Sequence, residues 1–287
     1  MTTSFEHRLA DKYDTLSARV REAGDYVARH PVDIASRSLR AVAGESGLAP
    51  ATFSRLARML EYDSFEELRE GMRRRIGRRV NSFADRAGRL QSDHGGGDTG
   101  FFNAHRDACL RNLQALSESI DPARLNAAVE RLHAARRVLL FGALGSTGIA
   151  EYMAYMARMM APQWEIAGRM GTSLGSALTG MGARDALVIV TMPPFSPKAL
   201  LLAELARAQG VYVVVITDTH ACPALRHADS GFLVQTESPH FFSSYVTPLF
   251  LVETMIGMLA SKAGPEATAR IAEVEECNRR LQEVSET

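Results

Sequence analysis

The chain has 287 residues, of which 46% are hydrophobic and 23% charged, and it carries no net charge. This composition is ordinary for a soluble globular protein, and the length is enough for two domains. No segment is long and uncharged enough to predict a membrane span, and the first residues have no signal-peptide pattern. We therefore expect a cytoplasmic protein with no membrane partner.

The distribution of charges along the chain indicates what kind of ligand its front part binds. Residues 1–90 hold 17 Lys and Arg against 13 Asp and Glu, whereas the remaining residues hold 16 against 20. This asymmetry indicates that the front of the chain binds a polyanion.

The cysteines have neither a Cys-x-x-Cys spacing nor a nearby pair of histidines; they are Cys109, Cys222 and Cys277. They predict no metal site and are interpreted as buried or incidental thiols, and we expect no cofactor.

Helices are predicted throughout the front of the chain. Residues 5–30 have apolar positions at spacings of three and four, which is typical of one amphipathic helix or of a helix pair. Pro31 ends this pattern, because proline disfavours helical geometry at the residue before it. Further helices are predicted at about 35–45 and 50–60, with Gly47 between them.

The spacing around Gly47 predicts a helix-turn-helix. Val42 and Ala43 precede the glycine by five and four residues, and Phe53 and Leu56 follow it by six and nine. This pattern places a small residue where two helices cross and glycine where the turn needs a positive φ. It also places apolar residues on the inner face of the second helix.

The outward face of that second helix is predicted to read DNA. In a helix-turn-helix it lies in the major groove, where arginine can pair with guanine edges and a hydroxyl can hold a phosphate. The alternative is an ordinary helical hairpin with a solvated face. A predicted helix at 66–80 adds six arginines directly downstream, which favours contacts with DNA phosphates. The predicted DNA-binding residues are Pro50, Thr52, Ser54, Arg55, Arg58, Arg73 and Arg74.

A change of pattern separates the front of the chain from the back. Residues 91–100 contain four glycines and no periodic apolar residues, which predicts a flexible loop or linker. A helix is predicted at 102–116, and the next has Asp121 as its cap and Pro122 as its first residue. We divide the chain into a helix-turn-helix DNA-binding domain at 1–80, a helical linker at 81–120 and a third domain at 121–287.

Short apolar runs alternate with helices in the third domain. Apolar runs without internal alternation, separated by helices, predict a parallel sheet covered on both faces. Ligands of such sheets bind at the carboxyl ends of the strands. The predicted strands are 138–141, 164–167, 186–191, 211–217 and 231–234, and the predicted helices are 149–160, 197–209 and 244–262.

The turns at these strand ends carry a candidate ligand site. Residues 142–148 form a glycine-rich turn between a strand and a helix, where backbone N–H groups and the helix dipole favour an anion, usually a phosphate. Ser146 and Thr147 add hydroxyls, and Ser196 is placed to cap the helix that begins at Pro197. Two such helix starts facing one crevice would hold a phosphorylated or carboxylated small molecule. Alternatively, the glycines only make a tight turn and Ser196 only caps its helix.

A nucleotide-binding enzyme is a minor alternative. Gly142, Gly145 and Gly148 form a variant of the dinucleotide fingerprint, and Glu165 lies about where an acidic ribose ligand would fall. However, the first two glycines are separated by two residues rather than one. A pair of hydroxyls is also not what a pyrophosphate-binding turn requires.

The order of these motifs resembles a known family. The turn at 142–147, the strand 185–191, the loop before Pro197, the run 210–218 and the segment 222–229 resemble a sugar isomerase (SIS) domain. Together with residues 49–55, the order is similar to that of the RpiR family of bacterial transcriptional regulators. The resemblance implies an all-α helix-turn-helix domain followed by a SIS domain, which is an α/β fold with a parallel sheet in three αβα layers, flavodoxin-like.

The resemblance also implies a function without catalysis. It implies a homodimer or homotetramer that binds a pseudo-palindromic DNA operator and senses a small-molecule effector, a sugar phosphate or a related carbohydrate derivative. The family's effector-binding roles fall on Ser146 and Thr147 in the first loop and on Ser196 in the second. The predicted effector-binding residues are Gly142, Gly145, Ser146, Thr147, Ser196, His240 and Ser243.

The sequence departs from the family pattern in two places. Ala49 stands where the family has a capping serine at the start of the recognition helix. The second loop contains Pro193, Pro194 and Pro197, which have no N–H to offer a phosphate. This loop leaves room for a less charged or more apolar effector.

A SIS-fold sugar-phosphate isomerase is the main alternative. Such an enzyme needs a general base, for which Glu151, Glu237 and His240 are candidates. None of them lies in a motif that fixes it in the crevice. His240 precedes a long helix and is placed to cap the pocket, or it is a loop histidine without a ligand. Because an isomerase leaves the DNA-binding front unexplained, we favour the regulator.

Overall fold

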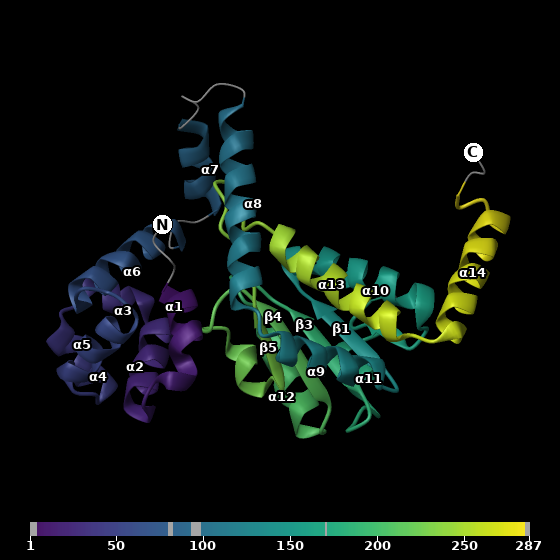
Figure 1. Ribbon diagram of the computed structural model, residues 1–287, viewed down its shortest axis with the longest axis horizontal. Coiled ribbons are helices and arrows are strands. Elements are labelled where there is room, and N and C mark those ends of the chain that lie inside the picture. The colour runs from purple at the N-terminus through teal and green to yellow at the C-terminus, as the bar shows by residue number, and fades with distance from the viewer. Residues whose placement is uncertain (1–4, 80–82, 93–98, 170, 285–287) are drawn as a thin grey trace. The chain divides into compact units, whose positions relative to one another are not determined.

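The structure, a computed structural model, describes residues 5–79, 83–92, 99–169 and 171–284. Its contacts divide the chain into two compact units, each described here by itself (Figure 1). The first, which we call the helical unit, comprises Met1–Ser119 and two short segments, Thr219–Ala221 and Glu237–Ser244. The second, which we call the sheet unit, comprises Ile120–Asp218, Cys222–Thr236 and Tyr245–Thr287.

The helical unit is built from eight described helices and one short 3-10 turn. In chain order they are α1 (Phe5–Lys12), η1 (Tyr13–Thr15), α2 (Ala18–Arg29), α3 (Pro31–Ser36), α4 (Leu39–Ser46), α5 (Pro50–Met59), α6 (Phe65–Arg79), α7 (Phe83–Ser92) and α8 (Gly100–Ser119). Of the two possibilities for residues 5–30, the structure has the helix pair. Pro31 ends α2 as predicted and is also the first residue of α3.

A core of buried apolar side chains joins helices α1 to α6. Leu9, Phe53 and Leu56 are fully buried in it. The Phe53 ring makes edge-to-face contacts with the rings of Tyr26 and Phe65, at centroid distances of 6.1 and 6.0 Å. The apolar spacing of the sequence is therefore the spacing of one shared core.

Helices α4 and α5 meet at the predicted turn. The Ser38 hydroxyl caps α4 by accepting a hydrogen bond from the Ala41 N–H at 3.3 Å. Gly47 ends α4 with a φ of 69°, which is the left-handed conformation that favours glycine. Pro50 is the first residue of α5, and Ala49 before it provides no side-chain cap. The prediction of a helix, a left-handed glycine turn and a second helix is confirmed here.

The flexible loop predicted at 91–100 falls mostly outside the described residues, which omit 93–98. At its edges the prediction was too wide, because α7 continues to Ser92 and α8 begins at Gly100. The helix predicted at 102–116 corresponds to α8.

The sheet unit alternates strands with helices. Its elements are α9 (Pro122–His133), β1 (Val138–Gly142), η3 (Leu144–Ser146), α10 (Thr147–Met160), β2 (Trp164–Ile166), α11 (Leu174–Leu178), β3 (Ala186–Val190), α12 (Pro197–Ala208), β4 (Tyr212–Thr217), η4 (Pro223–His227), β5 (Ser230–Leu233), α13 (Val246–Lys262) and α14 (Pro265–Arg280). The strands form one parallel sheet in the order β2-β1-β3-β4-β5. Asp121 caps α9 by accepting hydrogen bonds from the Ala123 and Arg124 N–H groups, as predicted.

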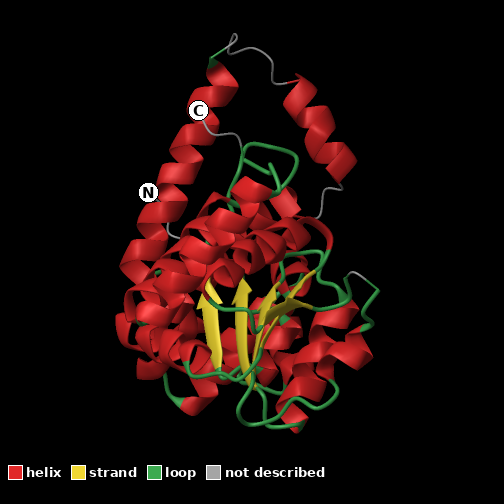
Figure 2. Cartoon of the chain, turned by 90° about the vertical axis from the view of Figure 1, so that its right-hand side faces the viewer, coloured by secondary structure: helices red, strands yellow, loops and turns green. Residues whose placement is uncertain are grey.

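Helices cover both faces of this sheet (Figure 2). Alternate residues of a strand point to opposite faces. Leu139, Ile189 and Val215 share one core with α11 and α12. The other face packs against α10, which contacts β1, β2 and β3 and also packs on α13. The predicted α/β fold with helices on both sides of a parallel sheet is confirmed.

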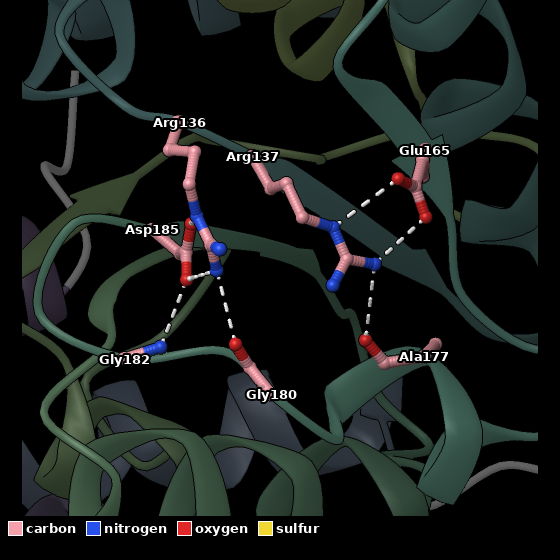
Figure 3. A network of polar contacts seen from close by, with 7 residues as sticks. All are labelled: Arg136, Arg137, Glu165, Ala177, Gly180, Gly182 and Asp185. Atoms are coloured by element: carbon pink, nitrogen blue, oxygen red, sulfur yellow. Dashed lines mark hydrogen bonds and ion pairs between the residues drawn. The ribbon is translucent and has the colours of Figure 1, made fainter.

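A network of hydrogen bonds and ion pairs connects residues near the amino ends of the strands (Figure 3). The Asp185 side chain, 1% exposed, accepts hydrogen bonds from Arg136 Nε at 2.9 Å and Nη2 at 2.7 Å. It also accepts one from the Gly182 N–H at 2.9 Å. Hydrogen bonding to Arg136 lowers the pKa of Asp185, although burial opposes this shift. Arg137 pairs with Glu165 in a more exposed position beside it.

In the sheet unit, two helices were not predicted from the sequence. Helix α11 has only five residues, and α14 has no buried residue. Within the described chain, no helix alone has the length and hydropathy to cross a membrane. The bent pair α13 and α14, at 116°, meets that criterion by length and composition when the two are taken together.

Candidate functional site

The first candidate loop leaves the sheet at the end of β1. A Cβ atom on Gly142 would lie 2.2 Å from the Ser146 carbonyl oxygen, so only glycine fits at this position. Thr147 Oγ1 donates a hydrogen bond to the Gly142 carbonyl at 3.2 Å. Gly145 is exposed in this loop. The turn therefore brings the end of β1 into close contact with the start of α10.

Ser146 faces a tyrosine of the sheet unit. Ser146 is 1% exposed, and its Oγ lies 3.2 Å from the phenolic oxygen of Tyr245, the residue before α13. Burial raises the pKa of the Tyr245 phenol, so the phenol is neutral at physiological pH. Nothing in the sequence pairs Tyr245 with Ser146, since 99 positions separate them.

The second candidate loop follows β3 and contains Ser196. The prediction that the Ser196 side chain caps α12 is wrong. Ser196 occupies the N-cap position of α12, but its side chain accepts no hydrogen bond there. Ser196 also lines a cavity of about 250 Å³. The residues around this cavity are Thr191, Phe195, Ser196, Pro197, Ala199, Leu200, Cys222, Pro223 and Ala224.

This cavity is mainly apolar, and none of the described residues that line it is charged. Its polar side chains are Thr191, Ser196 and Cys222, and burial raises the pKa of the Cys222 thiol, which favours the neutral form. Ser146 and Thr147 do not line it. A single crevice shared by Ser146 and Ser196 therefore remains a prediction.

The two loops nonetheless leave neighbouring strands. Gly142 at the end of β1 is paired with Val190 at the end of β3. The chain runs from β1 outward to β2 on one side, and the remaining strands lie on the other side. Such a reversal of strand order is where parallel sheets bind ligands, at the carboxyl ends of the strands. The topology thus favours a ligand between the two loops.

His240 and Ser243 belong by their contacts to the helical unit rather than to the sheet unit. His240 Nδ1 accepts a hydrogen bond from the Phe242 N–H at 3.1 Å, and its ring lies 4.3 Å from the Phe241 ring. Ser243 is half-buried in the same segment. The role of both residues as effector ligands stays a prediction.

The acidic residues of the two enzyme hypotheses have structural partners. Glu151 pairs with Arg169 at 3.2 Å, with both side chains about half-exposed. Glu165 pairs with Arg137 at 2.9 Å, near the amino ends of the strands. These pairings favour neither a general base at Glu151 nor a ribose ligand at Glu165. Among the described residues, no group of three His, Cys, Asp or Glu side chains is arranged to hold a metal.

Helix α5 presents two cations on its outer face. Phe53, Leu56 and Ala57 are buried, whereas Arg55 and Arg58 are exposed. Neither arginine has an ion-pair partner among the residues that the structure describes. The inner and outer faces of α5 are therefore those that the sequence predicted.

The other predicted DNA-binding residues differ in their contacts. Pro50 is exposed and Thr52 is half-buried. Ser54 Oγ donates a hydrogen bond to the Pro50 carbonyl at 3.3 Å. The side chains of Arg73 and Arg74 lie outside the described residues.

One arginine of the predicted cationic helix has a structural role. Arg69 is 19% exposed, forms an ion pair with Glu66, and donates a hydrogen bond to the Arg37 carbonyl at 3.1 Å. It joins α6 to the segment between α3 and α4. Arg69 of the predicted cationic helix is therefore engaged in contacts within the protein.

Comparison with known proteins identifies part of the chain. Residues 131–258 match the family model of the SIS domain. No match was found among curated proteins.

Solved structures share the fold at low sequence identity. The NanR protein of Vibrio vulnificus, complexed with ManNAc-6P, has 20% identity and a TM-score of 0.57, covering 97% of this chain and 99% of that one. The sugar isomerase domain of an RpiR transcription factor from Sphaerobacter thermophilus has 20% identity and a TM-score of 0.56, covering 60% of this chain and 96% of that one. These similarities establish the fold.

Proposed function

We propose that the protein is a DNA-binding transcriptional regulator of carbohydrate metabolism, because residues 131–258 match the SIS domain model behind a helical unit and the SIS domain of an RpiR transcription factor shares their fold. Its SIS domain would sense a sugar phosphate or a related carbohydrate derivative. We assign DNA reading to residues 1–80, a linker to 81–120, and effector binding with dimerisation to 121–287. Such a regulator acts in the cytoplasm as a homodimer or homotetramer.

The observation that carries the DNA assignment is the outer face of α5. Arg55 and Arg58 are exposed and unpaired among the described residues, on the helix that follows the Gly47 turn. A guanidinium in this position has the geometry to pair with a guanine edge in the major groove. In an isomerase these two cations would have no evident role.

The effector class follows from the chemistry of the two loops. The first loop offers a helix N-terminus and hydroxyls, which suit a phosphate or carboxylate. The second offers an apolar cavity with the Ser196 hydroxyl, which suits an uncharged part of the ligand. That NanR is described in complex with ManNAc-6P supports a phosphorylated sugar derivative.

Selection of bound sequences from a random DNA pool tests the DNA assignment. We expect the full chain to enrich a sequence with two related half-sites, because a symmetric dimer reads symmetric DNA. The substitution Arg55→Ala should weaken binding to the selected sequence by about 1–3 kcal/mol and relax the base preference at one position of each half-site.

Arg124→Ala is the matched control, since Arg124 is an exposed arginine on α9 in the sheet unit. It should leave the affinity for the selected sequence unchanged. Failure to enrich any sequence, or equal loss of affinity in both variants, would remove the DNA-reading role of α5.

The isomerase remains the second candidate because SIS folds also occur in such enzymes. Glu151 or His240 would then act as the general base. Conversion of a ketose or aldose phosphate by the purified protein, lost in Glu151→Gln or His240→Ala, would favour the enzyme over the regulator.

A further inference from the structure

The hydroxyl of Ser146 is covered by Tyr245. The oxygen–oxygen distance of 3.2 Å is longer than the usual separation of about 2.8 Å in an O–H···O hydrogen bond, so the contact is weak. Hydrogen bonds to an ionised group are roughly twice as strong as those between neutral groups. A phosphate or carboxylate oxygen is therefore a better partner for Ser146 than the neutral phenol is.

Tyr245 directly follows a segment of the helical unit. The segment Glu237–Ser244 connects β5 to α13, and by its contacts it belongs with the helices of the front of the chain. Tyr245, the next residue, belongs with the sheet unit. Tyr245 is thus covalently joined to this segment.

Helices α7 and α8 hold the segment at several points. Asn112 of α8 is 2% exposed and donates a hydrogen bond to the Glu237 carbonyl at 2.8 Å. Arg86 of α7 donates one to the His240 carbonyl at 2.9 Å. Cys109 Sγ of α8 lies 3.6 Å from the hydroxyl of Ser244, the last residue of the segment.

Aromatic packing adds to these polar contacts. The ring of Phe83 on α7 lies 5.0 Å from the Phe242 ring and 6.4 Å from the Phe241 ring, between centroids. The segment is therefore fixed to α7 and α8 by side chains along its length.

The residue before the segment, Thr236, forms a hydrogen bond within the sheet unit. Thr236 Oγ1 donates a hydrogen bond to Asp218 Oδ2 at 2.8 Å, and both residues are buried. Asp218 directly precedes Thr219–Ala221, the other short segment of the helical unit. Both short segments thus leave the sheet unit from one hydrogen-bonded pair at the carboxyl ends of β4 and β5.

We propose that Tyr245 is the positioning residue through which the effector acts on the helical unit. An anionic group of the effector takes the Ser146 hydroxyl, displaces the Tyr245 phenol, and so shifts the segment Glu237–Ser244 with α7 and α8. This inference rests on the proposed function and adds the regulation of the same site.

Titration calorimetry with glucose 6-phosphate and with inorganic phosphate tests the competition at Ser146. Tyr245→Phe keeps the ring but removes the competing hydroxyl, so it should bind these anions about threefold more tightly than the wild type. Ser146→Ala should bind them at least tenfold more weakly. Tyr155→Phe, which changes an exposed tyrosine on α10, should bind as the wild type does.

Hydrogen exchange of the full chain without ligand tests the connection to the helical unit. Tyr245→Phe should speed the exchange of amides in 237–244 about twofold to threefold, whereas Tyr155→Phe should not. Equal affinity in Tyr245→Phe and wild type, with Ser146→Ala weakened, would overturn the proposal but leave the effector site in place.

Absence of binding to either anion in every variant would count against the phosphate part of the proposed function. In that case the hydrogen-exchange measurement still tests whether Tyr245 positions the segment 237–244. Unchanged exchange in 237–244 would overturn it, and faster exchange would support it.

Discussion

The carboxylate of Asp185 lies almost fully buried before β3 and is held by Arg136, which donates two hydrogen bonds to it. Removing one member of a buried, charged hydrogen-bonded pair leaves the other unsatisfied, which is costly. This pair therefore fixes the amino ends of β1 and β3 with respect to one another. Its loss should loosen the edge of the sheet opposite the candidate effector loops.

We expect Asp185→Asn to lower the free energy of unfolding of the sheet unit by about 2 kcal/mol at neutral pH. Because the folded-state pKa of Asp185 is lowered, this contribution is present above the ordinary Asp pKa of about 3.9 and is lost as the pH falls through the folded-state value. The difference between variant and wild type should thus disappear in strong acid. Urea unfolding followed by the fluorescence of Trp164, the single tryptophan, buried in β2, measures it.

Glu165→Gln is the matched control, because Glu165 pairs with Arg137 in the same network but is 48% exposed. An exposed ion pair contributes about 0–1 kcal/mol, so this variant should change stability much less. Equal losses in the two variants, or a loss in Asp185→Asn that does not depend on pH, would contradict the role given to the buried pair.

At the scale of single elements, the turn between α4 and α5 depends on Gly47. Its φ of 69° is strained for any residue with a Cβ atom, although the space around it is open. Gly47→Ala should therefore destabilise this turn by about 1 kcal/mol. Faster hydrogen exchange of α4 and α5 amides is the measurement.

Gly44 provides the opposite case three residues earlier. It lies inside α4, its φ is not positive, and an added Cβ atom would meet nothing within 4 Å. Gly44→Ala should stabilise α4 by about 0.5–1 kcal/mol, because alanine loses less backbone entropy in a helix. Destabilisation by both substitutions, or by neither, would argue against a left-handed turn at Gly47.

The strands and the turns were predictable from the sequence because their signals are local. Buried parallel strands such as β3 and β4 are runs of apolar residues, and all five predicted strands appear within one or two residues of their predicted bounds. Gly47 and Pro122 mark a helix end and a helix start by their own backbone chemistry. Helix α14 was missed because it buries no residue and so has no core-facing pattern to detect.

The contacts within the candidate site were not predictable in the same way. The Ser146–Tyr245 pair joins residues 99 positions apart, and the sequence gives no sign of it. Ser196 stands where a capping residue belongs, yet the local backbone leaves its hydroxyl without a cap bond. Such contacts depend on how whole elements pack, which local spacing does not determine.

The whole chain combines a cationic helical unit with a sheet unit that carries candidate ligand loops. The front of the chain is positively charged and carries unpaired arginines on α5 among its described residues. Residues 131–258 match the SIS domain model and carry the candidate loops for a small molecule. If both ligands act on one equilibrium, each changes the affinity of the other by the same factor.

The most direct test of this central claim measures the dissociation constant for the selected DNA, by fluorescence anisotropy at fixed salt, with and without a saturating sugar phosphate that raises the melting temperature of the protein. We expect a change in DNA affinity of at least fivefold, with the sugar phosphate recovered unaltered. An unchanged DNA affinity at saturation, or conversion of the sugar phosphate to an isomer, would contradict it.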